Sequence, residues 1–310
     1  MVAPATANFI AKLTAGRADD LLSTLCLARE CALMVAPAMN RQMWENPSTQ
    51  RNIKTLLTDG VQLIGPDSGE QACGELGVGR MSEPALIASE IVSSLQPKLL
   101  QNKNVIVTAG PTYEAIDAVR GITNASSGKM GYAVAQAAQD AGANVTLISG
   151  KTSLNPPTNA RFISVISAQD MFDAVIKEID HADIFISVAA VADFKVKNPN
   201  EHKIKKSQKN LSIEFDETAD ILKSVAHRKN PPFCVGFAAE SQDVEEYARK
   251  KRIEKGIPLI AANLVTEALN SDDNSLILID DHGTKKLASS SKLEQARLLI
   301  THINRLIHNQ

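Results

Sequence analysis

Residues 105–131, VIVTAGPTYEAIDAVRGITNASSGKMG, contain a strand, a long connection and the start of a helix. The apolar run 105–109 predicts the strand, and the pattern from Lys129 to Ala141 predicts the helix. Connections between a strand and a helix usually have about 2–6 residues, whereas about eighteen separate these elements. The connection ends on Ser-Ser-Gly, whose backbone N–H groups would lie at the positive end of the helix, where phosphate binds well. We therefore expect an anion-binding loop here.

Within this loop, Ser126 or Ser127 can cap the helix, and Gly128 and Gly131 permit close approach of a ligand to the backbone. The loop matches neither GxGxxG nor the Walker A pattern, because Gly-Lys is followed by Met130 instead of Ser or Thr. An ordinary capped turn would explain the serines and the glycine, but not the length of the connection.

Strands and helices alternate from residue 104 to residue 310, which predicts a Rossmann-like α/β domain with a parallel sheet. Further strands are expected at 145–149, 161–166, 184–190, 211–215, 233–238 and 258–264, helices at 168–179, 219–228, 244–255 and 291–307, and a hairpin over 276–288. The run 184–190 is apolar throughout, as in a strand buried on both faces. Ligands of such sheets bind beyond the carboxyl ends of the strands.

Residues 1–96 predict a second α/β domain, and 97–103 a linker. Helices are expected at 9–31, 44–59 and 83–95, strands at 32–36 and 61–64, and an irregular stretch at 65–80. The sequence Met-Val-Ala-Pro occurs at 1–4 and again at 34–37, where an apolar strand leads into the Pro. Strands usually have about 5–6 residues, so the first copy leaves too little room for one. We expect an N-terminally truncated domain; a short edge strand is the alternative.

The composition excludes several classes of protein. The chain has 310 residues, 44% of them hydrophobic, and 33 basic against 35 acidic side chains, so its net charge is −2. This balance argues against a globally basic nucleic-acid-binding protein. The apolar runs are too short to span a bilayer, and no signal-peptide pattern opens the chain. The four cysteines have no metal-ligand spacing, so we expect a reducing, cytoplasmic location without membrane or nucleic-acid partners.

Charged side chains gather at two of the predicted strand ends. Asp193 follows the strand 184–190, and residues 195–209 contain six lysines and one glutamate. Such a run is usually a solvated loop, but directly after an Asp at the ligand edge it also fits a lid that closes on a triphosphate. Lys251 and Lys255 lie four residues apart on one face of the helix 244–255, where an ordinary helix surface is the alternative.

Taken together, these segments resemble the phosphopantothenate–cysteine ligases of the coenzyme A pathway. The matching motifs are TAGPT (108–112), NASSGKMG (124–131), AAVAD (189–193), KIKK (203–206) and GFAAE (236–240). The resemblance implies a reaction in two steps. CTP first activates the carboxylate of 4′-phosphopantothenate as an acyl-cytidylate and releases pyrophosphate, and the amine of cysteine then displaces CMP. It also implies Mg²⁺, whose ligands we cannot assign, and a homo-oligomeric, dimeric ligase.

The same resemblance implies roles for particular residues. Asn124 would stabilise the acyl-cytidylate, and Lys203 would close over the reacting phosphates and carboxylate. The nucleotide is expected at Ser126, Ser127, Gly128, Asp193, Phe237, Lys251, Lys255 and the turn Ala219, Asp220, Ile221 and Leu222. Ala219 stands where the family usually has Pro, which weakens the case for a backbone contact at that turn.

Residues 1–96 resemble a second family, the phosphopantothenoylcysteine decarboxylases, which are flavodoxin-like proteins that use FMN. The matching motifs are APATAN (3–8), PAMN (37–40), QACGE (71–75) and GRM (79–81). By position, Asn40 would bind the substrate carboxylate and Cys73 would protonate the enethiolate. The segment 3–8 would belong to a flavin pocket shared between subunits.

This family also uses a histidine and a flavin-phosphate loop that precede these motifs. All six histidines of the chain (181, 202, 227, 282, 302 and 308) follow residue 96. We therefore expect the truncated chain not to decarboxylate, although a full-length parent would catalyse both reactions. Two alternatives remain: a pyridine-nucleotide oxidoreductase, opposed by the missing GxGxxG, and a non-enzymatic flavin-binding or regulatory protein, opposed by the presence of both Asn124 and Lys203.

Overall fold

The computed structural model describes residues 1–71, 74–205, 212–240, 242–264 and 273–308. These residues form two compact units, Met1–Gln96 and Pro97–Gln310, and each is described by itself. Residues 97–103, the predicted linker, lie in the second unit: Leu100 is 2% exposed in its core, and the Leu100 N–H donates to the carbonyl of Ala141. Both units are α/β structures, as predicted.

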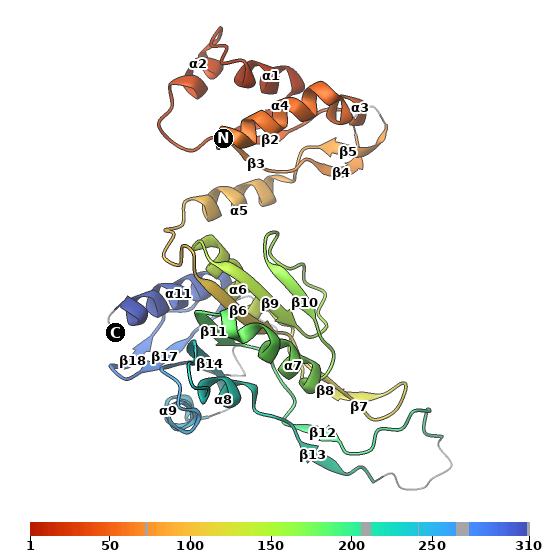
Figure 1. The fold of residues 1–310 in the computed structure, drawn as a ribbon, viewed down its shortest axis with the longest axis vertical. Helices are drawn as coiled ribbons and strands as arrows, with labels where there is room; N and C mark the ends of the chain where they lie inside the picture. The colour runs from red at the N-terminus through yellow and green to blue at the C-terminus, as the bar shows by residue number, and fades with distance from the viewer. Residues whose placement is uncertain (72–73, 206–211, 241, 265–272, 309–310) are drawn as a thin grey trace. The chain divides into compact units, whose positions relative to one another are not determined.

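The second unit is built on an eight-stranded sheet (Figure 1). Six strands are parallel: β6 (Asn104–Ala109), β9 (Asn144–Ser149), β10 (Arg161–Ser164), β11 (Ile184–Ser187), β14 (Phe233–Glu240) and β15 (Leu259–Leu264). Their spatial order is β10-β9-β6-β11-β14-β15, so the direction of winding reverses between β6 and β11. This is the order of the doubly wound nucleotide-binding folds, in which ligands bind at the reversal.

An antiparallel hairpin completes the sheet beside β15, where the sequence predicts one. Its strands are β17 (Ile277–Asp280) and β18 (Gly283–Lys286). Nearby, β16 (Asp273–Asn274) pairs with β19 (Ser290–Ser291). Ile279 is fully buried, so this hairpin adds to the core and also protects the parallel edge from pairing with other chains.

Helices cover both faces of this sheet. On one face, α6 (Lys129–Asp140) and α11 (Lys292–His308) pack against Val105 and Val107 of β6. On the other, α7 (Ala168–Glu178), the 3₁₀ turn η1 (Ile179–His181), α8 (Ile221–Ala226) and α9 (Val244–Lys255) pack against Ile106. Alternate residues of a strand face opposite sides of the sheet, so a strand that is covered by helices on both faces needs apolar residues at every position. The unbroken apolar runs in the sequence predict this arrangement.

Two short antiparallel ribbons project from the carboxyl-end side of the sheet and form an arm (Figure 1). One joins β7 (Tyr113–Ala115) to β8 (Gly121–Thr123), within the long connection after β6. The other joins β12 (Phe194–Val196) to β13 (Phe215–Glu217). The sequence analysis missed the first ribbon. Of the strand that it expects at 211–215, residue 211 lies outside the described residues, 212–214 form no strand, and β13 begins only at Phe215.

The first unit contains a three-stranded parallel sheet, in the order β1 (Val2–Ala5), β2 (Met34–Pro37) and β3 (Gln62–Leu63). The two Met-Val-Ala-Pro copies lie side by side, with Val2 opposite Val35. A strand therefore forms at residues 2–5, against the expectation that the first copy has room for none. It is the short edge strand of the alternative reading.

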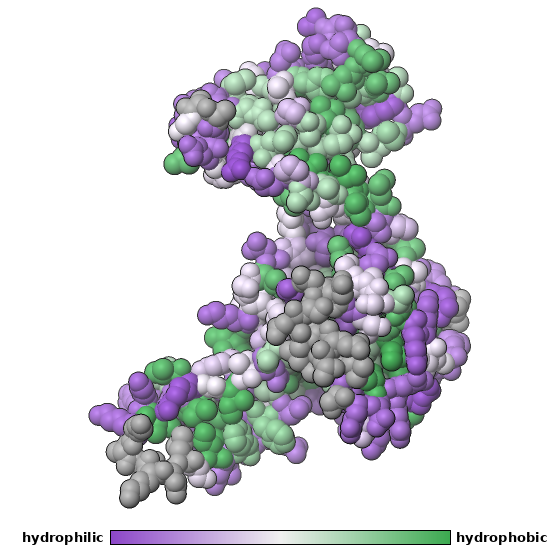
Figure 2. Space-filling model, turned by 180° about the vertical axis from the view of Figure 1, so that it is seen from behind, coloured by the Kyte–Doolittle hydropathy of each residue, from purple (hydrophilic) through white to green (hydrophobic). Residues whose placement is uncertain are grey.

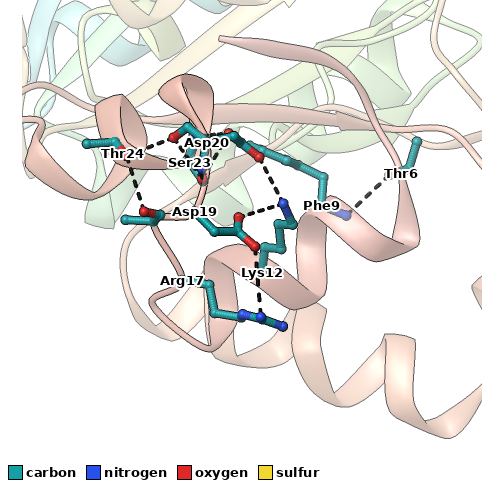
Figure 3. Close-up of polar contacts among 9 residues, drawn as sticks. Thr6, Phe9, Lys12, Arg17, Asp19, Asp20, Ser23 and Thr24 are labelled. Carbon is teal, nitrogen blue, oxygen red and sulfur yellow. Dashed lines mark hydrogen bonds and ion pairs between the residues drawn. The ribbon is translucent and has the colours of Figure 1, made fainter.

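The helix predicted over 9–31 is two helices, α1 (Ala7–Thr14) and α2 (Leu21–Ala28). Gly16 lies between them with a positive φ of 64°, and Asp20 caps α2 by accepting a bond from the Ser23 N–H. Lys12 Nζ lies 2.6 Å from Asp19 and 2.8 Å from Asp20, and so connects the two helices (Figure 3). These contacts with Lys12 lower the pKa of both carboxyl groups.

The remaining elements of the first unit are α3 (Arg41–Glu45), α4 (Pro47–Thr58), the hairpin β4 (Asp67–Glu70) to β5 (Leu76–Arg80), and α5 (Pro84–Ser94). The prediction of an irregular stretch over 65–80 was wrong, because β4 and β5 pair despite their glycines. The leucines at 21, 22, 25 and 27 of α2 are all exposed, and Figure 2 shows apolar surface on this unit. No described helix has the length and apolar character needed to cross a membrane.

Candidate active site

A cleft of about 460 Å³ opens in the second unit at the carboxyl ends of β6, β11, β14 and β15. It lies where the strand order reverses, the usual ligand site of such sheets. Of the residues that the sequence analysis assigns to the nucleotide or to catalysis, seven line it: Asn124, Ser126, Ser127, Gly128, Asp193, Phe237 and Lys251. The fold thus gathers in one place motifs that are more than 120 residues apart in the chain.

The glycine–serine loop forms one wall of the cleft. Gly128 is the N-cap of α6, with φ 76°, and has no side chain to cap the helix. Ser127 Oγ accepts a long bond of 3.5 Å from the N–H of Lys129, the first helical residue, so the expected serine contact with the helix start is present but weak. Ser126 Oγ instead accepts a bond of 3.3 Å from the Gly128 N–H within the loop. A glycine N-cap offers no side-chain acceptor to the N–H groups of the first turn after Lys129, which leaves them for an external acceptor such as phosphate.

Gly131 allows α6 to start close to the end of β6. A Cβ atom at this position would lie 2.5 Å from Ala109 Cβ, well inside van der Waals contact. The glycine therefore serves the packing of helix on strand, in addition to any approach of a ligand. This packing fixes the start of α6 beside the carboxyl end of β6.

Asn124 is held at the rim of the cleft by a backbone contact. Its Nδ2 donates a bond of 2.9 Å to the carbonyl oxygen of Ala190, which follows β11. The Thr112 N–H donates to the same oxygen at 3.2 Å. Three segments of the chain, after β6, before α6 and after β11, therefore meet at one carbonyl group.

Asp193, Phe237 and Lys251 form the wall of the cleft that the sequence analysis assigns to the nucleotide. Phe237 and Lys251 are half-buried, and Asp193 is exposed. Within the described part of the chain, neither Asp193 nor Lys251 has an ion-pair partner. An aromatic ring, a carboxylate and an ammonium group that line the same cleft suit a nucleoside phosphate.

The turn before α8 lies outside the lining of the cleft. The side chains of Ile221 and Leu222 are buried in the core, so neither can contact a nucleotide. Asp220 caps α8 and pairs with Lys255 at 3.2 Å. Ala219 is exposed. Only the backbone of this turn, and the paired charges of Asp220 and Lys255, are available to a ligand.

Lys203 does not line the cleft either: it is exposed, and the chain around it is attached to the arm. Asp117, which is 3% exposed in the turn between β7 and β8, accepts a bond from the Ile204 N–H at 3.1 Å. Arg120 Nη2 donates to the Ile204 carbonyl at 3.1 Å. We call these contacts the Ile204 clamp. Bonds from Arg120 above all, and from the backbone, lower the pKa of Asp117 and keep it ionised.

The sequence analysis missed both residues of the clamp, although Asp117 and Arg120 lie within the quoted stretch 105–131. It also missed three buried polar residues of the cleft, Asn263, Asn274 and Lys292. Asn263 lies in the carboxyl-terminal half of β15. Because ligands of parallel sheets bind at the carboxyl ends of the strands, its position in the sequence could have identified it. Asn274 and Lys292 carry no local signal, because only the tertiary fold brings them to the cleft.

The cleft is positively charged. Among the described residues, its lining includes the ammonium groups of Lys129, Lys251 and Lys292 and a single carboxylate, that of Asp193. Among the described residues, no group of three or more His, Cys, Asp or Glu side chains could hold a metal ion. Mg²⁺ binds many sites through one or two carboxylates and the phosphates of the substrate, and Asp193 is the lining residue that fits this mode.

A second cleft, of about 550 Å³, lies in the first unit. Asn40 lines it and caps α3, its Oδ1 accepting the Met43 N–H at 2.9 Å. Met39, Gln71 and Met81 line it too. Cys73, the expected proton donor, lies outside the described residues. Of the other cysteines, Cys234 is buried, and burial raises its pKa to about 12, so it is no nucleophile.

Two known protein families match the chain, one over each of the two units. Residues 100–307 match the model described as the DNA/pantothenate metabolism flavoprotein C-terminal domain, and residues 1–96 match the model described as Flavoprotein. The coenzyme A biosynthesis bifunctional protein CoaBC of Haemophilus influenzae is 50% identical over 98% of this chain and 77% of its own length. That of Escherichia coli K12 is 45% identical over 98% and 77%.

Two solved structures have the fold of the second unit. The C-terminal domain of a CoaBC protein superposes with a TM-score of 0.60 and 41% identity, over 69% of this chain and 100% of that domain. The DNA/pantothenate metabolism flavoprotein from Streptococcus pneumoniae superposes with a TM-score of 0.58 and 24% identity, over 66% and 99%. The second likeness concerns the fold alone.

Proposed function

The chain belongs to the family of bifunctional coenzyme A biosynthesis proteins named CoaBC, with a flavoprotein domain and a ligase domain, and from this premise we propose that residues 104–310 catalyse the CTP-dependent ligation of 4′-phosphopantothenate with cysteine. The observation that carries the proposal is the cationic cleft at the reversal of the strand order. It combines an N-cap glycine, three lysines and Asn124. Such a cleft suits a substrate with several phosphate charges and an activated carboxylate.

The reaction needs two displacements. A carboxylate oxygen of 4′-phosphopantothenate attacks the α-phosphorus of CTP, the bond to the β-phosphate breaks, and pyrophosphate leaves with the electron pair. The amine of cysteine then attacks the acyl carbon, CMP leaves, and one amine proton passes to water or phosphate. Mg²⁺, held by the phosphates and Asp193, would neutralise charge on the nucleotide. The protein supplies oriented donors for the charge that develops at each step.

Asn124 and Lys203 take different parts in this scheme. The bond from Asn124 Nδ2 to the Ala190 carbonyl fixes the amide at the cleft, where it stabilises the acyl-cytidylate. Lys203 stands next to the clamped residue Ile204, and its ammonium group has no partner among the described side chains. The Ile204 clamp therefore holds the backbone next to Lys203 on the arm. The ammonium group of Lys203 closes over the reacting phosphates during activation.

The cytidine and α-phosphate part of the nucleotide belongs against Phe237, Lys251 and Asp193. The ring offers a face for stacking, and Lys251 offers a charge to the α-phosphate. The Asp220–Lys255 pair lies at the start of α8 and can reorganise when a phosphate approaches. We expect CTP to be preferred over ATP because the motifs of residues 104–310 resemble those of the CTP-dependent ligases.

The flavoprotein unit would take FMN in the cleft beside Asn40. Met39 and Met81 offer apolar contacts to a flat ring, and the Asn40 amide suits a substrate carboxylate. FMN would supply the oxidation that makes loss of CO₂ possible. Residues 1–96 contain no histidine, so we expect this 310-residue chain alone to release no CO₂ from phosphopantothenoylcysteine. FMN-dependent release of CO₂ by the purified chain would refute this.

We also propose that the ligase is a homodimer joined through the arm. Apolar side chains are exposed on both ribbons, namely Tyr113, Val119, Phe194 and Phe215. Figure 2 shows apolar surface on this part of the molecule. Light scattering tests the assignment: Phe194→Glu should yield monomers, and an unchanged mass would contradict it.

The ligase function is tested by incubating the chain with CTP, 4′-phosphopantothenate and cysteine. Mass spectrometry should find phosphopantothenoylcysteine, CMP and pyrophosphate in equal amounts. Reactions with ATP or NADPH in place of CTP are the controls. Turnover with NADPH would favour an oxidoreductase, and the absence of any product would overturn the proposal.

A further inference from the structure

One corner of the cleft is formed by side chains that no sequence motif singles out. Asn263 in β15, Asn274 in β16 and Lys292 at the start of α11 line it. Their exposed fractions are 9%, 4% and 8%, unusually low for polar side chains that face an open cleft. We call these three residues the Asn–Asn–Lys corner.

The amide of Asn274 is oriented by its own hydrogen bonds. Its Oδ1 accepts the Ser275 N–H at 2.9 Å and Asn263 Nδ2 at 3.4 Å. Its Nδ2, in contrast, has a single partner in the described ranges, the sulfur of Met130 at 3.8 Å. A thioether is a weak acceptor, so a buried N–H donor at the cleft is left without a strong one. This donor fits an anionic oxygen.

The charge at the Asn–Asn–Lys corner is positive, which also favours an anionic ligand. Lys292 is the first residue of α11, a helix of 17 residues, and Lys129 is the first residue of α6. Both lysines line the cleft, and the two helices pack side by side (Figure 1). Two positive helix ends and two ammonium groups therefore meet on one side of the cleft. Lys251 lies on α9, which covers the opposite face of the sheet.

We propose that the Asn–Asn–Lys corner binds the β- and γ-phosphates of the nucleotide and holds pyrophosphate as it leaves. The inference rests on the proposed ligase function. When the bond between the α- and β-phosphates breaks, the electron pair remains on an oxygen of the β-phosphate. Lys292 and the Asn274 amide offer a charge and a donor to that oxygen, so they assist activation of the carboxylate but not formation of the amide.

The test compares CTP with CMP, because only CTP carries the β- and γ-phosphates. Lys292→Met and Asn274→Ala should each raise the Kd for CTP at least about tenfold in calorimetric titrations. The Kd for CMP should stay within about twofold. Lys177→Met, at an exposed position of α7, is the matched control and should change neither value. Equal losses for CTP and CMP, or no loss for either, would overturn the inference.

Two further measurements separate possible causes of failure. Wild-type chain that binds no CTP contradicts the proposed function itself, whereas normal wild-type binding with unaffected variants contradicts the corner alone. Competition on the wild type needs no variant to fold: inorganic pyrophosphate should displace CTP but bind together with CMP. Mutual exclusion of pyrophosphate and CMP would place pyrophosphate at the α-phosphate position and refute the corner.

Discussion

The side-chain amide of Asn124 donates a hydrogen bond of 2.9 Å to the backbone carbonyl oxygen of Ala190. This bond joins the loop before α6 to the segment after β11, on the two sides of the reversal in strand order. The cleft therefore has an amide of fixed position at its rim, supported by backbone that Thr112 also holds.

Asn124→Asp should slow the second half-reaction more than the first. A carboxylate cannot donate to the Ala190 carbonyl, and it places negative charge beside the acyl-cytidylate. We expect amide formation from preformed intermediate to fall about 100-fold, the size seen when one donor is removed from a reacting oxygen. Rapid-quench kinetics measure this rate. Asn155→Asp, at an exposed loop position, is the control, and a normal amide-forming rate in Asn124→Asp would refute the role.

Lys203→Gln should block activation and leave nucleotide binding nearly unchanged. The substitution removes a charge that acts only after the loop closes over the phosphates, so pyrophosphate release should fall at least about 100-fold. The Kd for CMP should stay within about twofold. Lys197→Gln, an exposed arm position that pairs loosely with Glu214, should behave as wild type. Wild-type rates in Lys203→Gln would show that this lysine has no part in the reaction.

Asp117→Asn should weaken the Ile204 clamp. One acceptor oxygen replaces two, while the donors of Val119, Arg120 and Ile204 remain. We expect pyrophosphate release to fall about tenfold, because Lys203 loses its fixed attachment, while CMP affinity stays constant. Asp216→Asn on the exposed strand β13 is the control. A full rate of release in Asp117→Asn would separate the clamp from catalysis.

The stability of the chain should fall in mild acid because of His302. This imidazole is buried and lies 2.7 Å from the Asp280 carboxylate. Burial, which disfavours the charged ring, lowers its pKa despite the opposing effect of Asp280. Below the ordinary pKa of about 6.5, the unfolded chain binds a proton before the folded chain does, so the free energy of unfolding decreases.

Denaturation followed by circular dichroism at pH 7.5 and pH 5.5 checks this effect. The loss of stability between these pH values should be smaller in His302→Gln than in the wild type. His181→Gln, at an exposed position, should lose as much as the wild type. An equal loss in His302→Gln would show that another group controls the acid response.

Local patterns in the sequence predicted the regular part of the second unit. The apolar runs at 105–109 and 184–190 and the loop 124–131 predict the strands, the helix start and the loop that lines the cleft without any long-range information. Seven of the expected nucleotide and catalytic residues line one cleft because parallel strands end on the same edge of a sheet. Their roles remain predictions.

What the sequence did not reveal depends on contacts between distant segments. The Ile204 clamp joins residues 84 to 87 positions apart, and the Asn–Asn–Lys corner needs β15, β16 and α11 to meet. The strand at Val2–Ala5 and the hairpin at 67–80 were missed for another reason. Their prolines and glycines oppose strand formation locally, and pairing with β2, or between β4 and β5, overrides that preference.

The central claim is that this chain activates a carboxylate with CTP, and one half-reaction tests it directly. The chain is mixed with 4′-phosphopantothenate and either CTP or ATP, in the presence of Mg²⁺ but without cysteine, and pyrophosphate and acyl-nucleotide are measured over time. We expect one equivalent of pyrophosphate per active site and an acyl-cytidylate, with CTP only. Absence of pyrophosphate with CTP, or equal release with ATP, would contradict the account.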